Sequence, residues 1–194
     1  NHWGVPLSLS RMPVDSVYGV FELGMNRAGE IAPLSRMVRP HVAIITNVEL
    51  VHLEFFASLG EIADAKAEIF AGLQPGGIAI LNRDNTYFTH LETAAKAAGA
   101  GRIISFGAHE AAEVRLIELA QHPTCNCIFA DIDGQAVTYK VGAPGRHWAI
   151  NSLAVLAAVR ALSADLGLAA LAMADVLPTS GRGARHRVDY GDGS

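Results

Sequence analysis

The sequence has little cysteine, little net charge and no long apolar run. Its two cysteines, Cys125 and Cys127, are too few and too close together for a disulfide framework, so we interpret both as ordinary strand residues of a protein in a reducing cytoplasm. The formal net charge of −4 gives no electrostatic case for binding nucleic acid or an anionic membrane. No apolar run approaches the roughly 20 residues of a membrane-spanning helix.

The composition is that of a globular protein. Of 194 residues, 51% are hydrophobic and 18% are charged, which predicts one domain with a sizeable core. The sequence begins at Asn1 without a methionine and ends on the polar, Gly-rich segment 181–194. We therefore expect a domain over 1–180, belonging to a longer protein, and the start of a linker over 181–194.

Strands and helices are predicted to alternate in the first half of the chain. Short apolar runs predict strands, and apolar residues at helical spacing predict helices; the strands are 17–23, 41–46, 78–81 and 102–106, and the helices are 29–39, 59–73 and 87–98. Nearly continuous apolar strands between helices predict a mostly parallel α/β sheet with helices on both faces. Segment 1–13 contains Gly4, Pro6 and Pro13 and is predicted to be irregular.

The pattern changes after residue 113. Three strand candidates, 114–119, 126–131 and 136–141, follow one another without a helix between them, and Asp133-Gly134 is a hairpin signal. These strands predict a small antiparallel sheet attached to the main one. Two more helices are predicted over 148–162 and 168–177.

Polar side chains follow the ends of the first three predicted strands. They are Glu22, Thr46, Asn47, Glu49, His52, Asn82 and Asp84. Ligands of open α/β sheets bind beyond the carboxyl ends of the strands, and this set of oxygen and imidazole ligands suits Mg²⁺ serving phosphates. Other interpretations stay open: Glu22 as a solvated strand-end charge, His52 as a loop histidine packed beside Phe55 and Phe56, and Asn82 and Asp84 as turn formers.

Lys66 occupies an unusual position for a lysine. It falls within an apolar stripe formed at helical spacing by Ile62, Ile69 and Leu73. Its ammonium group either extends past the edge of the stripe or is partly buried, which would lower its pKa. A neutral amine can react with carbon dioxide to give a carbamate, which is an anionic metal ligand.

A Gly-rich turn precedes the helix predicted near residue 148. In the segment GAPGRHWAINSLAVL, His147 and Asn151 are four residues apart and share one helix face. Ile150, Leu153 and Ala157 form the packing face. An imidazole and an amide at a helix start could hold a purine ring; the alternative is a helix terminus with exposed polar groups.

Several motifs together resemble a known family. Five segments resemble, in the same order, the central domain of the Mur ligases: GVFELGMNRAGEI, TNVELVHLEFF, ADAKAEIFAGL, LNRDN and GAPGRHWAINSLAVLAAV. The opening NHWGVPLSL is similar to that family as well. The resemblance covers nearly the whole chain. It implies a P-loop-type domain whose phosphate-binding loop, Gly-x-x-Gly-Lys-Thr, is absent. That loop, with its strand and helix, would lie upstream of Asn1, and amino- and carboxyl-terminal domains would be missing too.

The resemblance implies an ATP-dependent ligase of peptidoglycan precursor synthesis in the cytoplasm. In this family a carboxylate attacks the γ-phosphate of ATP, and an amine then displaces phosphate from the acyl phosphate. The motifs are most similar to members that add D-alanyl-D-alanine to UDP-N-acetylmuramoyl-tripeptide, with Mg²⁺ as cofactor. Without the phosphate-binding loop, we expect the 194 residues alone to be inactive. The alternatives are a folylpolyglutamate or cyanophycin synthetase-like ligase, and a non-catalytic nucleotide-binding domain.

The resemblance also implies roles for individual residues. The catalytic residues and metal ligands would be Glu22, His52 and a carbamylated Lys66. The nucleotide-binding residues would be His147, Asn151 and Arg182, and the substrate side would hold Asn1, Asn26, Thr46 and Asn47. The chain departs from the family pattern at Arg27, where this type often has His, and at Trp148, where many relatives have Asn.

Overall fold

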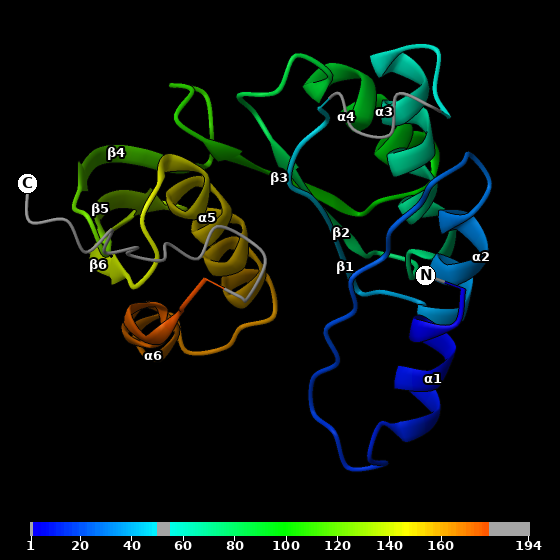
Figure 1. Ribbon diagram of the computed structural model, residues 1–194, viewed down its shortest axis with the longest axis horizontal. Helices are drawn as coiled ribbons and strands as arrows, with labels where there is room; N and C mark the ends of the chain where they lie inside the picture. The colour runs from blue at the N-terminus through cyan, green and yellow to red at the C-terminus, as the bar shows by residue number, and fades with distance from the viewer. Residues whose placement is uncertain (1, 50–54, 179–194) are drawn as a thin grey trace, which may run out of the picture.

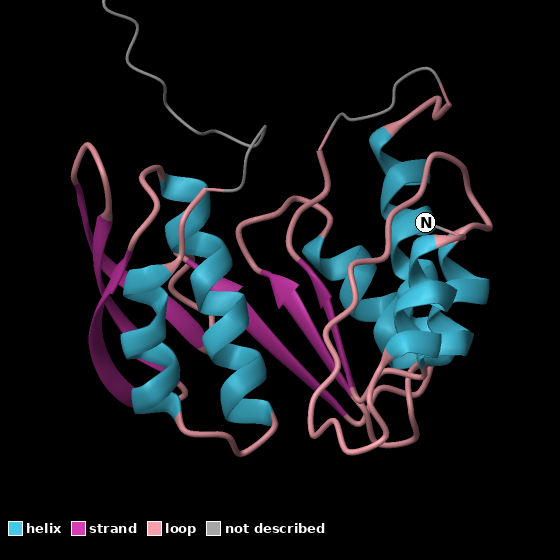
Figure 2. Ribbon diagram, turned by 60° about the horizontal axis from the view of Figure 1, so that its bottom comes forward, coloured by secondary structure: helices cyan, strands magenta, loops and turns pink. Residues whose placement is uncertain are grey.

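A six-stranded sheet lies between two layers of helices (Figures 1 and 2). The computed structural model describes residues 2–49 and 55–178. The strands lie in the sheet in the order in which they occur in the sequence. They are β1 (Val42–Ile45), β2 (Ile78–Asn82), β3 (Arg102–Gly107), β4 (Val114–Gln121), β5 (Asn126–Ile132) and β6 (Gln135–Val141). The predicted α/β class is therefore confirmed.

The antiparallel strands continue the parallel sheet. Strands β1, β2 and β3 are parallel, and β4 joins β3 in parallel through only two residue pairs, Phe106 with Val114 and Gly107 with Arg115. Strands β4, β5 and β6 are antiparallel. Asp133 and Gly134 connect β5 to β6 with φ values of 54° and 83°, as a type I′ hairpin turn requires. The predicted small antiparallel sheet is thus one end of a single sheet.

The helices match most of the predicted ones in position. They are α1 (Gly4–Arg11), α2 (Ile31–Val38), α3 (Leu59–Ala67), α4 (Phe88–Ala97), α5 (Arg146–Ala161) and α6 (Leu166–Ala172), with 3₁₀ turns η1 (Glu68–Gly72) and η2 (Met173–Asp175). Across residues 2–49 and 55–178, no helix has both the length and the apolar character needed to cross a membrane.

Alternation along β2 divides the core into two clusters. Ala79 and Leu81 face a cluster formed with α3, η1 and α4, whereas Ile80 faces a second cluster formed with α5 and α6. Leu153 and Leu156 of α5 are fully buried in that second cluster. A strand buried on both faces reads as a continuous apolar run, which is why β2 was recognisable in the sequence.

Two features of the amino-terminal segment differ from the predictions. Segment 1–13 was expected to be irregular, but residues 4–11 form α1. Pro6 is the third residue of this helix, and a proline is tolerated in the first turn because the backbone N–H there has no intrahelical acceptor.

The strand predicted over 17–23 is wrong. These residues are extended but have no strand partner among the described residues. Val17 and Val20 are 82% and 97% exposed, so the apolar run does not enter the core. Sequence pattern identifies a segment suited to a sheet, but a strand exists only where a neighbour pairs with its backbone.

The predicted helix 59–73 changes geometry at Glu68, where α3 gives way to η1. The Glu68 carboxylate accepts hydrogen bonds from the backbone N–H groups of Ile31 and Ala32 at the start of α2, both at 3.1 Å. A carboxylate in this position caps the free N–H groups of a helix and complements its dipole. The tightened turn therefore joins α2 to the layer that carries Lys66.

Tyr139 of β6 connects the sheet to α5 by a hydrogen bond. Its burial predicts that the protein loses stability at alkaline pH. Its hydroxyl lies 2.8 Å from Ser152 Oγ, and burial raises its pKa from 10.0 to about 12. The folded state therefore keeps a proton that the unfolded chain loses, and its contribution to stability, full below about pH 10, is lost as pH rises towards 12. Denaturation of wild type and Tyr139→Phe between about pH 9 and 12 measures this loss.

The Phe variant should have a flatter profile over that range. Tyr18→Phe, on the exposed segment, serves as the control and should follow wild type. Parallel profiles for wild type and Tyr139→Phe would contradict the prediction.

Candidate functional site

The carboxyl ends of β1 and β2 are tied together by side-chain amides. The Asn82 amide donates to the carbonyl of Thr46 at 2.9 Å, and the Asn85 amide donates to Asn47 Oδ1 and to the carbonyl of Val48. Asn47 in turn donates to Glu49. The prediction that these strand ends meet at one edge is confirmed for β1 and β2. Because β1 and β2 are parallel and in register, their carboxyl ends coincide.

The Asp84 side chain binds the backbone of the loop that follows β3. Its carboxylate accepts hydrogen bonds from the N–H groups of Ala108 and His109 at 2.8–2.9 Å. Gly107 has φ +146°, and a Cβ there would lie 2.5 Å from Asp84 Oδ1. Asn82 Oδ1 accepts from the Asp84 N–H. Both residues thus act as turn formers, as one interpretation of the sequence held.

Helix α5 brings His147 and Asn151 to the same edge. Its first residue is Arg146, and Gly145 precedes it with φ +106°. Both His147 and Asn151 are exposed, whereas Leu153 and Ala157 are fully buried. The predicted division of this helix into a polar face and a packing face is confirmed.

These elements border an open hollow of about 450 Å³. Its walls come from the ends of β1 and β2, the turn after β2 and the first two turns of α5, and its lining residues are Thr46, Asn47, Val48, Glu49, Asn82, Asp84, Asn85, Thr86, Arg146, His147, Ile150 and Asn151. We refer to this hollow as the edge cavity. It lies in the size range of small-molecule sites, and its walls combine amides, carboxylates, one imidazole and one guanidinium.

Lys66 is half-buried on α3, which favours the partly buried one of the two alternatives that the sequence left open. Burial lowers the pKa of its ammonium group, and the nearby charge of Glu49 opposes part of that shift. At a given pH, a larger fraction of this amine is therefore uncharged than in a free lysine. Lys66 is absent from the walls of the edge cavity, but Glu49, whose charge it senses, lines it.

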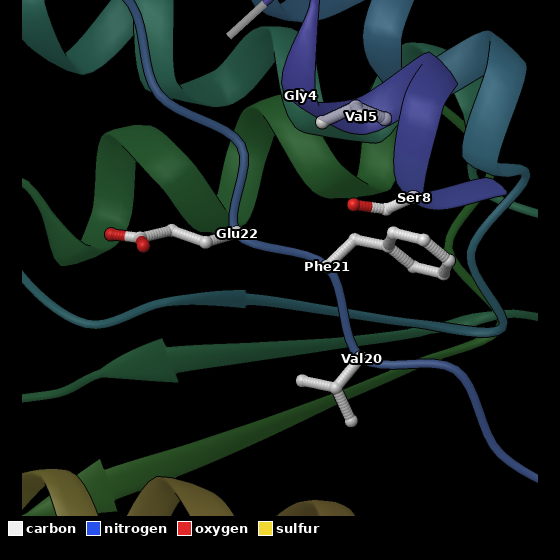
Figure 3. Close-up of a pocket in the computed structure, with 6 residues that line it drawn as sticks. All are labelled: Gly4, Val5, Ser8, Val20, Phe21 and Glu22. Atoms are coloured by element: carbon white, nitrogen blue, oxygen red, sulfur yellow. The ribbon is translucent and has the colours of Figure 1, made fainter. Parts of the chain in front are cut away.

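Glu22 lies at a different hollow. A space of about 270 Å³ is lined by Gly4, Val5, Ser8, Val20, Phe21 and Glu22. Figure 3 shows Phe21 turned towards Ser8 of α1, while the Glu22 carboxylate points away from that helix. Glu22 is exposed on the extended segment, so its predicted place at the end of a strand is wrong.

Three predicted site residues, Asn1, His52 and Arg182, lie outside the described residues. Within 2–49 and 55–178, no three His, Cys, Asp or Glu side chains gather as a metal cluster would require. The roles of Glu22, His52 and Lys66 in holding metal stay a prediction.

The loop that follows Glu22 carries Asn26 and Arg27. The N–H of Asn26 donates to Glu30 at 2.8 Å, and this hydrogen bond is the largest cause lowering the pKa of the Glu30 carboxyl. The Arg27 guanidinium lies 5.6 Å from the ring centroid of Phe55. The Arg27 contact attaches the loop to the segment leading into α3, and the substrate-side role of Asn26 stays a prediction.

Sequence reasoning missed Arg146 and Asn126. Arg146 lines the edge cavity, and its place directly before His147 in the first helical turn was the available signal. Asn126 is fully buried at the start of β5, and its amide reaches the turn before α5. No local pattern marks a polar residue in a strand as a contact to a distant turn.

Comparison with known families gives one match over most of the chain. The family described as the Mur ligase middle domain matches residues 1–159. Among curated proteins, the UDP-N-acetylmuramoyl-tripeptide–D-alanyl-D-alanine ligase of Rickettsia prowazekii (strain Madrid E) is 35% identical over 183 residues. The aligned part covers 94% of this chain and 41% of that protein, so the chain spans about two fifths of its relative.

Solved structures give the same similarity. A crystal structure of MurF from Acinetobacter baumannii superposes with a TM-score of 0.85 at 30% identity, covering 92% of this chain and 38% of that one. The MurF ligase of Thermotoga maritima in complex with ADP superposes with a TM-score of 0.70 at 25% identity, covering 87% and 39%.

Proposed function

This chain belongs to the Mur ligase family, and on that premise we propose that the intact protein adds D-alanyl-D-alanine to UDP-N-acetylmuramoyl-tripeptide with ATP. One observation carries the proposal: polar side chains from the segment after β1, the end of β2 and the turn after it, and α5 line one cavity at the carboxyl edge of the sheet. This is where open α/β sheets bind ligands. The names of the relatives supply the reaction and its substrates.

The nucleotide is proposed to lie against α5. His147 and Asn151 are exposed on one helix face and line the edge cavity, and an imidazole and an amide can bind the ring nitrogens and amino group of a purine. Arg146 supplies a cation that can accompany phosphate. The ADP-bound relative supports a nucleotide in this fold. Arg182 is proposed to join this set.

The reaction proposed joins two substrates through an acyl phosphate. The tripeptide carboxylate attacks the γ-phosphorus of ATP and releases ADP. The amine of D-alanyl-D-alanine then attacks the acyl carbon, releasing phosphate and a proton as the amide forms. Both steps bring anions together, so cations and hydrogen-bond donors at the site lower the barrier. Asn1, Asn26, Thr46 and Asn47 are proposed to line the substrate side.

Oxygen ligands suited to Mg²⁺ are available on this chain. Glu22 offers an exposed carboxylate, and the lowered pKa of Lys66 favours the free amine that reacts with carbon dioxide. Its carbamate would add anionic oxygens, which Mg²⁺ prefers. We propose that Glu22, His52 and carbamylated Lys66 hold the metal, which when bound would neutralise phosphate charge.

The intact protein tests the function directly. UDP-N-acetylmuramoyl-tripeptide, D-alanyl-D-alanine, ATP and Mg²⁺ should yield the UDP-linked pentapeptide with one phosphate per ligation. Turnover with a folate and glutamate instead would move the function to the folylpolyglutamate type, and no turnover with either would favour a non-catalytic nucleotide-binding domain.

Variants of α5 test the nucleotide side. His147→Ala and Asn151→Ala should each raise KM for ATP about tenfold, because each removes a polar contact worth about 1.4 kcal/mol, with little change in KM for D-alanyl-D-alanine. Val155→Ala is the matched control, because Val155 lies one turn after Asn151 on the exposed face of α5, 42% exposed. Unchanged KM for ATP in both α5 variants would place the nucleotide elsewhere.

A further inference from the structure

A buried asparagine holds the turn that precedes α5. Asn126, the first residue of β5, is 0% exposed. Its amide nitrogen donates to the carbonyl of Ala143 at 2.8 Å and to that of Gly145 at 2.9 Å. On the other side, the N–H of Gly142 donates to the carbonyl of Met173 at 3.0 Å. The turn is therefore fixed from two distant parts of the chain.

The position of this turn sets the position of His147. A Cβ on Gly145 would lie 3.0 Å from Cε1 and 3.2 Å from Nδ1 of the His147 ring, so the imidazole packs directly over the bare Cα of Gly145. The Gly145 carbonyl that Asn126 holds also accepts from the N–H of Trp148 at 3.1 Å. A shift of Gly145 would move the ring that lines the edge cavity.

Packing alone does not explain an asparagine at this position. Asn126 Oδ1 is buried and has no hydrogen-bond partner among the described residues, and a buried acceptor without a partner destabilises the fold. A leucine, which branches at the same atom, would have no unpaired acceptor but could not hold the two carbonyls. The role of the side chain is therefore to donate the two hydrogen bonds that hold the turn.

We infer that Asn126 is a positioning residue for the nucleotide-side wall of the edge cavity, acting through Gly145 on His147. The inference rests on the proposed function, since it assigns the positioned wall to ATP. Binding groups must be held within a fraction of an ångström by their supporting contacts. Loss of the two hydrogen bonds should therefore weaken ATP binding without altering the reacting groups.

Two variants of the intact protein separate the amide donors from the shape of the side chain. Asn126→Leu keeps the branching at Cγ but is bulkier, and Asn126→Asp keeps the outline but, when ionised, has no N–H to donate. Each should raise the Kd for a non-hydrolysable ATP analogue by up to about tenfold, the limit set by losing His147 itself, with kcat at saturating ATP within about twofold. Hydrogen exchange at the Trp148 N–H should become faster in both, even without nucleotide.

Tyr139→Phe is the matched control. It removes another buried hydrogen bond between the sheet and α5, the 2.8 Å contact with Ser152, without touching the turn. It should lower Tm as the Asn126 variants do but leave the Kd for the analogue unchanged. If Asn126→Leu does not fold, Gly145→Ala perturbs the same contact from the His147 side and should weaken binding equally.

Wild-type affinity and wild-type exchange at Trp148 in a folded Asn126 variant would overturn the inference. Equal loss of affinity in Tyr139→Phe would overturn it too, because general destabilisation would then explain the effect. If the wild-type intact protein binds no ATP analogue, the proposed function fails instead. The exchange rate at Trp148 then still decides whether Asn126 holds the turn.

Discussion

Lys66→Ala in the intact protein is expected to lower kcat for ligation at least about 100-fold, the scale of losing one electrostatic contact at a reacting centre. Lys66 is half-buried, and burial lowers the pKa of its amine. A neutral amine reacts with carbon dioxide to form a carbamate with release of a proton. The variant would lose this proposed anionic group entirely.

The carbamate can be observed independently of turnover. Protein equilibrated with ¹³C-bicarbonate should show a carbamate carbonyl signal by ¹³C NMR that is missing in Lys66→Ala. A small carboxylate such as acetate should restore part of the activity, because it can supply the lost anionic oxygens. Lys96→Ala is the matched control: Lys96 is an exposed lysine on α4 that pairs with Glu92 at 3.2 Å, and this variant should ligate like wild type.

Retention of ligation by Lys66→Ala, with only a lower Tm, would contradict the catalytic role. It would favour the alternative in which this domain binds nucleotide without taking part in chemistry. Loss of ligation without a carbamate signal in wild type would instead keep Lys66 as a cation and remove it from the proposed metal ligands.

Gly72→Ala is expected to destabilise the chain by about 3 kcal/mol, the upper end of what overpacking a tight contact usually costs. A Cβ on Gly72 would lie 2.1 Å from the carbonyl oxygen of Ser35 and 2.5 Å from the backbone nitrogen of Arg36. These are backbone atoms of α2, so no side-chain rotation relieves the overlap. The hydrogen bond from the Gly72 N–H to Ser35 Oγ at 3.1 Å would have to lengthen as well.

Gly60→Ala gives a control of opposite sign. Gly60 is the second residue of α3, and a Cβ there would meet Ser58 and Tyr87 only at ordinary contact distances of 3.6–4.0 Å. Alanine in a helix is favoured over glycine by up to about 1 kcal/mol. Urea denaturation should therefore place Gly72→Ala well below wild type and Gly60→Ala at or above it. Equal midpoints would show that α2 and η1 can move apart at little cost.

Apolar periodicity correctly predicted the elements whose buried faces stay the same along their whole length. β2 is apolar at every position up to Asn82 because both of its faces are covered, and α5 has a clean packing face because it lies along the sheet. The strand-end side chains Thr46, Asn47, Asn82 and Asp84 could be expected to meet because parallel strands in register end together.

The same reasoning wrongly predicted a strand over 17–23. Most of its residues are apolar, yet Val20 is 97% exposed and the segment pairs with no strand among the described residues. Strand formation depends on a neighbouring backbone that can be distant in the sequence, so local pattern cannot establish it. Glu22 consequently lines a hollow beside α1 rather than a strand end.

The sequence by itself determined the α/β class, the two faces of α5 and the placement of a lysine in an apolar stripe, because each depends on spacing within one element. Only the tertiary structure decided that Asn126 reaches Gly145, that Glu68 caps α2, and that Arg146 lines the edge cavity. Each of these contacts joins residues distant in sequence or depends on where a helix docks. The contacts of Asn126 and Glu68 are set by the packing of the whole sheet and leave no local pattern, and the position of Arg146 in the first helical turn becomes informative only once α5 is docked.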